Sequence, residues 1–309
     1  MPKVVVVAGP TASGKSRLAM DIATRFDGVI INADSQQRYG QLKILSAFPS
    51  AADMNAAPHQ LFGDLAPEET GSAAEWASKA AQEIRDASAG SRLPIVVGGT
   101  GFYLRALMEG MADIPPVPND VRRAGEQLLA KIGNAKFHER LVARDPATVA
   151  RLAPGDTQRL LRAWEVVEAT GVPLSDWHTV PSAPPIFARY FKVVILPPRE
   201  DLYAACNARF QDMVAAGAVN ELRAFLNGGG SSSMPIMRIL GARELRAHLA
   251  GEIGLGDAIA SAQTATRQYA KRQVTWFKHQ FSGDKLLETV PRDAACAAVC
   301  SDVEGFLST

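Results

Sequence analysis

The chain has 309 residues, of which 47% are hydrophobic and 21% charged, a composition typical of a globular protein with a buried core and not of a disordered chain. A net charge of +1 gives no overall field for nucleic acid, so such a ligand would need a local basic patch. The 3 cysteines are too few for a disulfide scaffold, and the apolar runs are shorter than the roughly 20 residues of a membrane span. We therefore expect a cytoplasmic protein that acts as a monomer and has no membrane partner.

The N-terminal part of the chain predicts alternating strands and helices. Its first apolar run is short, continuous and bounded by Gly9 and Pro10, which is typical of a buried parallel strand. Residues 41–67 are rich in alanine and proline and are expected to form a loop. The expected order is a strand at 4–7, a helix from Lys15, a strand at 28–34, a helix at 73–89 and a strand at 94–99.

The pattern then changes between two proline-rich stretches, 114–118 and 181–185. Residues 119–170 show only helical periodicity, strand character returns at 191–196, and helical patterns continue to about residue 281. Alternating strands and helices predict an α/β fold, a P-loop NTPase-like parallel sheet with helices on both faces. We expect this core domain to comprise residues 1–114 and 186–309, with an inserted all-helical domain at 115–185.

A phosphate-binding loop follows the first predicted strand directly. Residues 9–16 fit G-x4-G-K-[ST] in full and precede a predicted helix, so backbone N–H groups and the helix N-terminus can hold an anion. Lys15 would add a point charge, and the Ser16 hydroxyl can ligate Mg²⁺. The motif predicts a bound diphosphate-like group without naming its carrier. Its residues are Gly9, Pro10, Thr11, Ala12, Ser13, Gly14, Lys15 and Ser16.

Asp34 and Thr100 end two further predicted strands. Ligands of open parallel sheets bind outside the carboxyl ends of the strands, so both residues are expected near the phosphate loop. Asp34 can be a base that faces an acceptor, a water-mediated Mg²⁺ contact, or a cap or turn residue. Thr100, within Gly98-Gly99-Thr100-Gly101, can position a substrate by hydrogen bonding or cap the helix that follows.

Three clusters of basic residues lie in predicted helices of this nearly neutral chain. Arg159 and Arg162 share one helix face, and Arg122 precedes them in the predicted insertion. Between residues 263 and 279 there is no Asp or Glu, and Arg267, Lys271 and Arg272 alternate with aromatic residues. A single cluster of this kind is commonly a solvated helix face, but the three together favour a nucleic-acid surface.

Taken together, six strings resemble the bacterial tRNA dimethylallyltransferases, also called tRNA isopentenyltransferases. A phosphate loop alone is shared by many families, whereas these strings in this order are highly specific. They are GPTASGKS at 9–16, INADSQQRY at 31–39, PIVVGGTGFYLRAL at 94–107, DTQRLLRAWEV at 156–166, NARF at 207–210 and TRQYAKRQVTWF at 266–277.

The resemblance implies transfer of a dimethylallyl group from dimethylallyl diphosphate to the exocyclic amine of the adenosine 3′-adjacent to the anticodon, with Mg²⁺ and release of diphosphate. Asp34 would be the general base, Thr100 the residue that contacts the adenine, and Lys15, Ser16 and Arg209 contacts to diphosphate or Mg²⁺. The helical insertion would grip the tRNA anticodon arm. The expected tRNA contacts are Asp34, Ser35, Gln36, Gln37, Thr100, Arg122, Gln158, Arg159, Leu160, Leu161, Arg162, Arg267, Lys271 and Arg272.

Two positions depart from the family pattern. Phe48 replaces the lysine of a Gly-Thr-Ala-Lys-Pro stretch, which predicts a changed entrance to the site, and Ala242 replaces a tyrosine after Gly241. Two other functions remain open. A small-molecule or nucleoside kinase would use the same phosphate loop and Asp34 but would not need the basic clusters. A tRNA-binding module without catalysis would leave the loop and Asp34 without a task.

Overall fold

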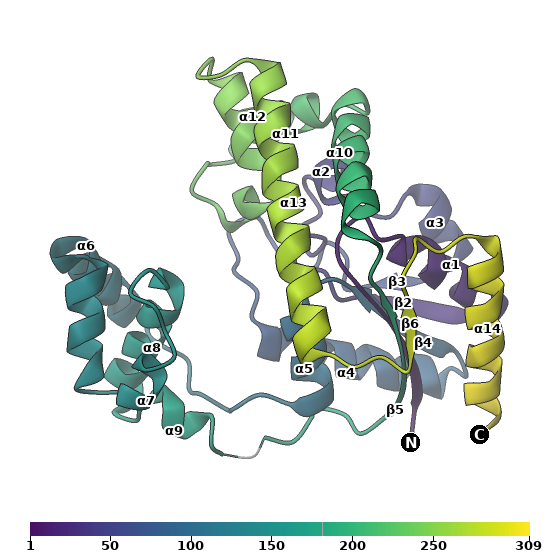
Figure 1. Ribbon diagram of the computed structural model, residues 1–309, viewed down its shortest axis with the longest axis horizontal. Helices are drawn as coiled ribbons and strands as arrows, with labels where there is room; N and C mark the ends of the chain where they lie inside the picture. Colours follow the sequence, from purple (N-terminus) through teal and green to yellow (C-terminus); the bar gives the residue numbers. More distant parts are fainter. Residues whose placement is uncertain (181) are drawn as a thin grey trace. The chain divides into compact units, whose positions relative to one another are not determined.

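A computed structural model describes residues 1–180 and 182–309, which form two compact units (Figure 1). The larger unit consists of Met1–Met108 and Pro185–Thr309, and the smaller unit of Glu109–Pro184. Of the helices that the model describes, none is long and apolar enough to cross a membrane.

A six-stranded parallel sheet forms the centre of the larger unit, in the order β3-β2-β4-β1-β5-β6. The central strand β1 pairs with β4 on one side and with β5 on the other, so that Val6 lies opposite both Val96 and Lys192. The loop after β1 therefore lies where the strand order reverses, which is where such sheets bind ligands. The strands are β1 (Lys3–Ala8), β2 (Gly28–Asn32), β3 (His59–Gln60), β4 (Leu93–Gly98), β5 (Arg189–Ile195) and β6 (Lys285–Leu287).

Helices cover the sheet, and the predicted α/β fold is confirmed. Helices α1 and α14 pack against one face, where Leu18, Ile22 and Val299 join a core with Val5 and Val7. Helix α4 packs against β2 and β4, with Trp76 fully buried. These helices are α1 (Lys15–Arg25), α4 (Ala73–Ala89), α5 (Gly101–Glu109) and α14 (Asp293–Ser308).

A second core lies among the helices that follow β5. Phe210, Leu222 and Leu245 pack there with Leu42 and Leu45 from the segment after β2. The 26-residue helix α13 packs against both α10 and α12 and crosses the carboxyl end of the sheet (Figure 1). The elements are α10 (Arg199–Ala215), α11 (Ala218–Asn227), the 3-10 helix η1 (Pro235–Arg238), α12 (Ala242–Leu249) and α13 (Leu255–Gln280).

The prediction of a loop at residues 41–67 is wrong. This stretch contains α2 (Lys43–Ser46), α3 (Ala51–Ala56) and the short strand β3. Elements this short carry too few residues to show a hydrophobic period. One local signal is nevertheless present, because Ser50 and Asp53 form a capping box: the Ser50 hydroxyl accepts from the Asp53 N–H, and the Asp53 carboxylate accepts from the Ser50 N–H.

The smaller unit contains four helices among its described residues: α6 (Asn119–Val142), α7 (Pro146–Val149), α8 (Thr157–Thr170) and α9 (Leu174–Trp177). Phe137, Leu141, Leu160 and Val166 fill its own core. The fully buried Asp145 carboxylate accepts hydrogen bonds from the N–H groups of Thr148 and Ser175 and so ties the starts of α7 and α9 together. The helical character expected from the sequence is therefore observed.

Candidate active site

The phosphate loop connects β1 to α1 and has the backbone of an anion cradle. Ala12 and Gly14 lie in the left-handed region with φ of 61° and 88°, and a non-glycine residue there is uncommon outside functional turns. No side chain caps the start of α1, so its first N–H groups are left for a ligand. The buried Ser13 hydroxyl has no hydrogen-bond partner among the described residues. The loop fits a diphosphate on these grounds.

Lys15 is buried, and its ammonium group donates a 2.7 Å hydrogen bond to the carbonyl of Pro10 in its own loop. Burial lowers the pKa of Lys15 to about 8, an effect that the Asp34 carboxylate opposes and the Arg209 guanidinium reinforces. A negatively charged ligand would favour the charged ammonium form of Lys15 and so oppose the effect of burial on its pKa. The single loop carbonyl carries no full charge and cannot do this.

Arg209 reaches the same place from α10. Its Nη1 donates to the hydroxyl of Thr11 at 3.2 Å, and burial lowers its pKa while Asp34 opposes that shift. Two cations and one carboxylate thus meet at the carboxyl ends of β1 and β2. The cations outnumber the carboxylate, so this part of the site favours an anion.

Asp34 follows β2 in a turn held by its neighbours. The Asn32 side chain accepts from the Asp34 N–H at 2.8 Å and donates to the Asp34 carbonyl at 3.0 Å and to the Leu61 carbonyl at 2.9 Å. These bonds end β2 at Asn32, two residues before the predicted end. One oxygen of the Asp34 carboxylate accepts from the Gln36 N–H at 3.0 Å. Asp34 is therefore a turn residue through one oxygen, which leaves the other for a ligand.

Thr100 lies beside this turn. Its hydroxyl accepts from the Ser35 N–H at 3.0 Å and lies 3.4 Å from the Ser35 hydroxyl. Its carbonyl accepts the first helical hydrogen bonds of α5, from Tyr103 and Leu104. The Thr100 side chain thus joins the ends of β2 and β4, and only its backbone starts the helix.

A cavity of about 410 Å³ opens beside the loop and is lined by both polar and apolar residues. Lys15, Ser16, Asp34 and Arg209 line its polar part. The remaining wall mixes polar and apolar side chains, and its apolar members can contact a short hydrocarbon chain. They include Ala19, Met20, Ile30, Phe48, Phe62 and Val97.

Phe48, the departure from the family pattern, is one of these apolar residues. Its ring meets Phe62 edge-on at 5.7 Å, and Phe62 in turn meets His59 at 5.3 Å. The Lys43 ammonium lies 5.3 Å from the centre of the Phe48 ring. A positive charge is thus still present beside the position where family members carry lysine.

A second, much smaller cavity shares Thr11, Asp34 and Arg209 with the first. Tyr269 of α13 lines it, and burial raises the pKa of Tyr269 above its usual range, as does the nearby Asp34 charge. Asp34 therefore lines both cavities, as Thr11 and Arg209 do.

Of the expected tRNA contacts in the larger unit, some make hydrogen bonds within the protein and others are exposed to solvent. The Gln36 side chain accepts from the Leu240 N–H, and the Gln37 side chain donates to the Ala47 carbonyl at 2.6 Å, so both brace the protein. Arg267 donates to the Asn207 side chain at 2.6 Å. Lys271 and Arg272 are exposed on α13, with Arg272 over the Tyr269 ring.

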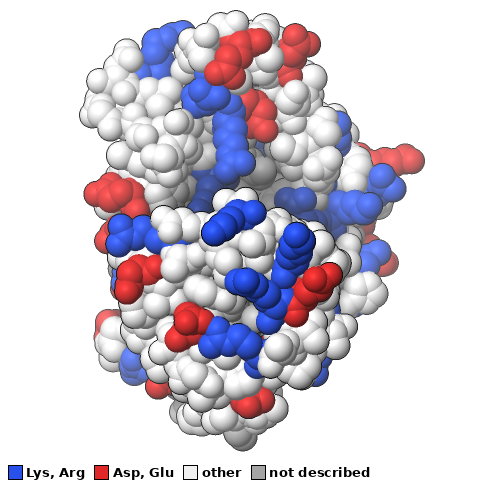
Figure 2. All heavy atoms as spheres, turned by 90° about the vertical axis from the view of Figure 1, so that its left-hand side faces the viewer, with Lys and Arg blue, Asp and Glu red and all other residues white. Residues whose placement is uncertain are grey.

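In the smaller unit, Arg122 and Arg162 lie close enough for their charges to interact. Burial lowers the pKa of Arg162, the Arg122 charge lowers it further, and Glu165 opposes the shift. Gln158 and Arg159 are exposed and Leu161 is half-buried, whereas Leu160 is fully buried, so its side chain packs in the core. Figure 2 shows Lys and Arg side chains gathered on the face it draws.

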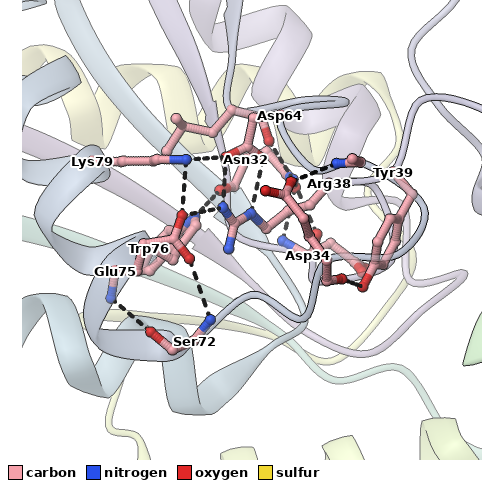
Figure 3. A network of polar contacts seen from close by, with 12 residues as sticks. Asn32, Asp34, Arg38, Tyr39, Asp64, Ser72, Glu75, Trp76 and Lys79 are labelled. Carbon is pink, nitrogen blue, oxygen red and sulfur yellow. Dashed lines mark hydrogen bonds and ion pairs between the residues drawn. The ribbon is translucent and has the colours of Figure 1, made fainter. Parts of the chain in front are cut away.

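An ionic network around the buried Arg38 lies near Asp34 (Figure 3), and its members were not predicted as site residues. The fully buried Arg38 donates to both oxygens of Asp64, at 2.8 and 2.6 Å, and to Glu75 at 3.1 Å. The Trp76 indole N–H donates to the Asn32 carbonyl at 2.7 Å. A polar residue at the end of an apolar strand, as Asn32 is, was the signal in the sequence.

The donor groups at the loop suit Mg²⁺ held mainly by a ligand's phosphates. The described residues include no group of three or more His, Cys, Asp or Glu side chains that could hold a metal ion. The Ser16 hydroxyl and the Asp34 carboxylate line the same cavity, and both are hard oxygen donors. Mg²⁺ is commonly bound by one or two such groups together with phosphates and waters.

Known proteins resemble this chain over most of its length. A family model described as IPP transferase matches residues 37–280. The tRNA dimethylallyltransferase of Rhodospirillum centenum is 51% identical over 286 residues, covering 92% of this chain and 91% of the relative. That of Rhodospirillum rubrum is 46% identical over 305 residues, covering 98% of this chain and 94% of the relative.

Among solved structures, a eukaryotic dimethylallyltransferase acting on tRNA has a TM-score of 0.85 at 26% identity, covering 100% of this chain and 80% of that one. A tRNA isopentenylpyrophosphate transferase from Bacillus halodurans has a TM-score of 0.69 at 27% identity, covering 100% and 97%.

Proposed function

Because the chain belongs to the IPP transferase family, we propose that it transfers a dimethylallyl group from dimethylallyl diphosphate to the exocyclic amine of the adenosine 3′-adjacent to the anticodon in tRNA. Diphosphate is the second product. The observation that carries the proposal is that Asp34 lines the same cavity as Lys15, Ser16 and Arg209 at the phosphate loop.

The donor lies with its diphosphate on the loop N–H groups and its hydrocarbon chain along the apolar residues of the larger cavity. Lys15 and Arg209 supply positive charge where negative charge develops as the carbon–oxygen bond breaks. Ser16 would contact Mg²⁺, which when bound would supply charge stabilisation for the leaving diphosphate.

The acceptor adenine enters from the side of Thr100. The amine of adenine is too weak an acid for a carboxylate to deprotonate it in advance. As nitrogen bonds to the allylic carbon, the amine becomes cationic and acidic, and Asp34 takes its proton. Until then the free oxygen of Asp34 and the Thr100 hydroxyl orient the amine.

The helical unit grips the anticodon arm. Extruding the adenine from its stack costs a few kcal/mol, and phosphate contacts from basic side chains offset that cost. We assign such contacts to Arg122, Arg159 and Arg162, with Lys271 and Arg272 of α13 in the larger unit, and we expect Gln158 and Leu161 to contact other parts of the tRNA. The loop, Asp34, Thr100 and Arg209 all come from one chain, so a monomer suffices for catalysis. An enzyme of tRNA works in the cytoplasm.

The test is an incubation of the purified protein with Mg²⁺, labelled dimethylallyl diphosphate and unmodified tRNA that carries adenosine 3′ of the anticodon. Label should enter tRNA and an equal amount of diphosphate should be released. A parallel incubation with ATP and a nucleoside should form neither ADP nor a nucleoside monophosphate. Phosphoryl transfer without label in tRNA would instead identify a kinase.

A further inference from the structure

A single buried side chain connects the phosphate loop to the strand end that carries Thr100. Gln273 of α13 is 5% exposed, and its Oε1 accepts from the Thr11 N–H at 2.8 Å. Its Nε2 donates to the Gly99 carbonyl at 2.7 Å. Both ends of one planar amide are used, each on a different element.

The two anchor points belong to the two halves of the reaction. Thr11 is in the phosphate loop, and its hydroxyl receives the hydrogen bond from Arg209. Gly99 directly precedes Thr100, whose hydroxyl is bonded to the turn after Asp34. The Gln273 amide therefore spans from the donor side to the acceptor side.

Gly99 and Gly101, on either side of Thr100, have no side chain, and this allows α13 to pack closely against their backbone. A Cβ atom on Gly99 would lie 2.3 Å from the Gln273 amide nitrogen, and one on Gly101 would lie 2.1 Å from the Trp276 ring. Gln273 and Trp276 are three residues apart and share one side of α13. Helix α13 thus packs closely against the backbone on both sides of Thr100, which restricts the distance between α13 and this segment.

We propose that Gln273 is a positioning residue that fixes the distance between the donor's diphosphate and the target adenine. The inference rests on the proposed prenyl transfer. Reacting atoms must be held about 3–3.5 Å apart, and a misplacement of about 1 Å can cost roughly 100-fold in rate. An amide is needed because it donates at one end and accepts at the other.

The test compares Gln273→Met with Gln263→Met. Gln263 also anchors α13, by donating to the Asn207 carbonyl at 3.0 Å, but it does not touch the loop or Thr100. Single-turnover transfer at saturating donor and tRNA should fall about 30- to 100-fold in Gln273→Met and less than about twofold in Gln263→Met. The donor held without a well-placed amine should react more often with water, which raises the ratio of dimethylallyl alcohol to prenylated tRNA.

Gln273→Glu gives a second readout that loss of stability would not produce. A protonated carboxyl can still accept from Thr11 and donate to Gly99, whereas a carboxylate faces the Gly99 carbonyl with no proton to donate. The ratio of its transfer rate to that of wild type at the same pH should rise as the pH falls. Taking this ratio cancels the pH dependence that both proteins share, including that of Lys15 and Tyr269.

Each outcome points to a separate conclusion. Wild-type transfer together with equal rates and equal alcohol ratios in Gln273→Met and Gln263→Met would overturn the role of Gln273, as would a Gln273→Glu ratio that does not change with pH. A wild-type protein that transfers nothing would instead overturn the proposed function. If Gln273→Met is too unstable to assay, the pH profile of Gln273→Glu decides alone.

Discussion

The side chain of Asn32 holds Asp34 by its backbone on both sides, accepting from its N–H at 2.8 Å and donating to its carbonyl at 3.0 Å. Asn32 itself is fully buried, and its own carbonyl accepts from the Trp76 indole. The position of the proposed base is thus set from the core of the sheet and not by a surface loop.

Asn32→Ala should slow transfer at saturating substrates by about 10-fold or more, because the Asp34 turn loses its support. It should also lower the free energy of unfolding by about 1–3 kcal/mol, since the Leu61 carbonyl and the Asp34 N–H lose a buried partner. Asn32→Asp keeps the acceptor for the Asp34 N–H, so its transfer rate and its free energy of unfolding should lie between those of the wild type and of Asn32→Ala. Steady-state kinetics that show an unchanged kcat in Asn32→Ala would disprove this role.

Donor affinity should depend on pH through Lys15. Its pKa of about 8 applies to the free protein, because burial favours the neutral amine. A bound diphosphate favours the charged form, so above pH 8 binding must take up a proton, and affinity should fall by up to about tenfold per pH unit. Below about pH 8 it should be constant with respect to this group.

Calorimetric titration of dimethylallyl diphosphate between pH 7 and about 9.5 checks this dependence; the second pKa of a phosphoryl group is near 6, so the donor is already ionised. The matched control is Lys15→Arg, which stays charged over the whole range and should bind with a flat profile. A flat profile in the wild type would mean that Lys15 is charged before the donor binds.

Arg122 and Arg162 should contribute to tRNA affinity through phosphates. Changing either to Ala should weaken binding about equally for all tRNAs and lower the salt dependence by about one ion each. Lys131 lies nine residues after Arg122 on α6, and nine residues bring a helix half a turn round, so Lys131→Ala is the control. Filter binding at several salt concentrations measures both the tRNA affinity and its salt dependence. Equal salt slopes in all four proteins would remove these residues from the tRNA surface.

Arg38 should matter for stability. Arg38→Met leaves the half-buried Asp64 without the guanidinium, whose hydrogen bond and charge outweigh burial and keep the pKa of that carboxyl low. Removing one partner of a buried pair costs about 3–5 kcal/mol. Arg92→Met removes an exposed pair with Asp27 and should cost at most about 1 kcal/mol. In urea unfolding, Arg38→Met should therefore have a clearly lower midpoint than Arg92→Met. Similar midpoints would contradict a stabilising role of Arg38.

Sequence patterns anticipated the parts of the fold that repeat over many residues. Helices α1 and α4 and the helical insertion carry a period that a short window can detect, and the buried strands are short continuous apolar runs. The elements α2, α3 and β3 are too short for that. The C-terminal strand β6 has three residues, and it pairs with β5 through contacts that only tertiary structure specifies.

The candidate site was anticipated where a motif fixes the chemistry, as at Lys15, Asp34 and Thr100. It was missed where a residue acts on backbone groups of another element. Gln273 lies on the buried side of α13 with Ala262, Ala270 and Phe277, and a lone amide among such residues was a signal of buried hydrogen bonding. Its partners, Thr11 and Gly99, are more than 170 residues away and could not be inferred from spacing.

Prenyl transfer with Asp34 as the base is tested most directly by mass spectrometry of nucleosides from tRNA treated with wild-type protein, Asp34→Asn or Asp34→Ala. The account predicts one dimethylallyl group on the exocyclic amine of the adenosine 3′ of the anticodon, formed about 100-fold or more slowly by either variant. A prenyl group on another nucleoside, or variants that react at the wild-type rate, would contradict it.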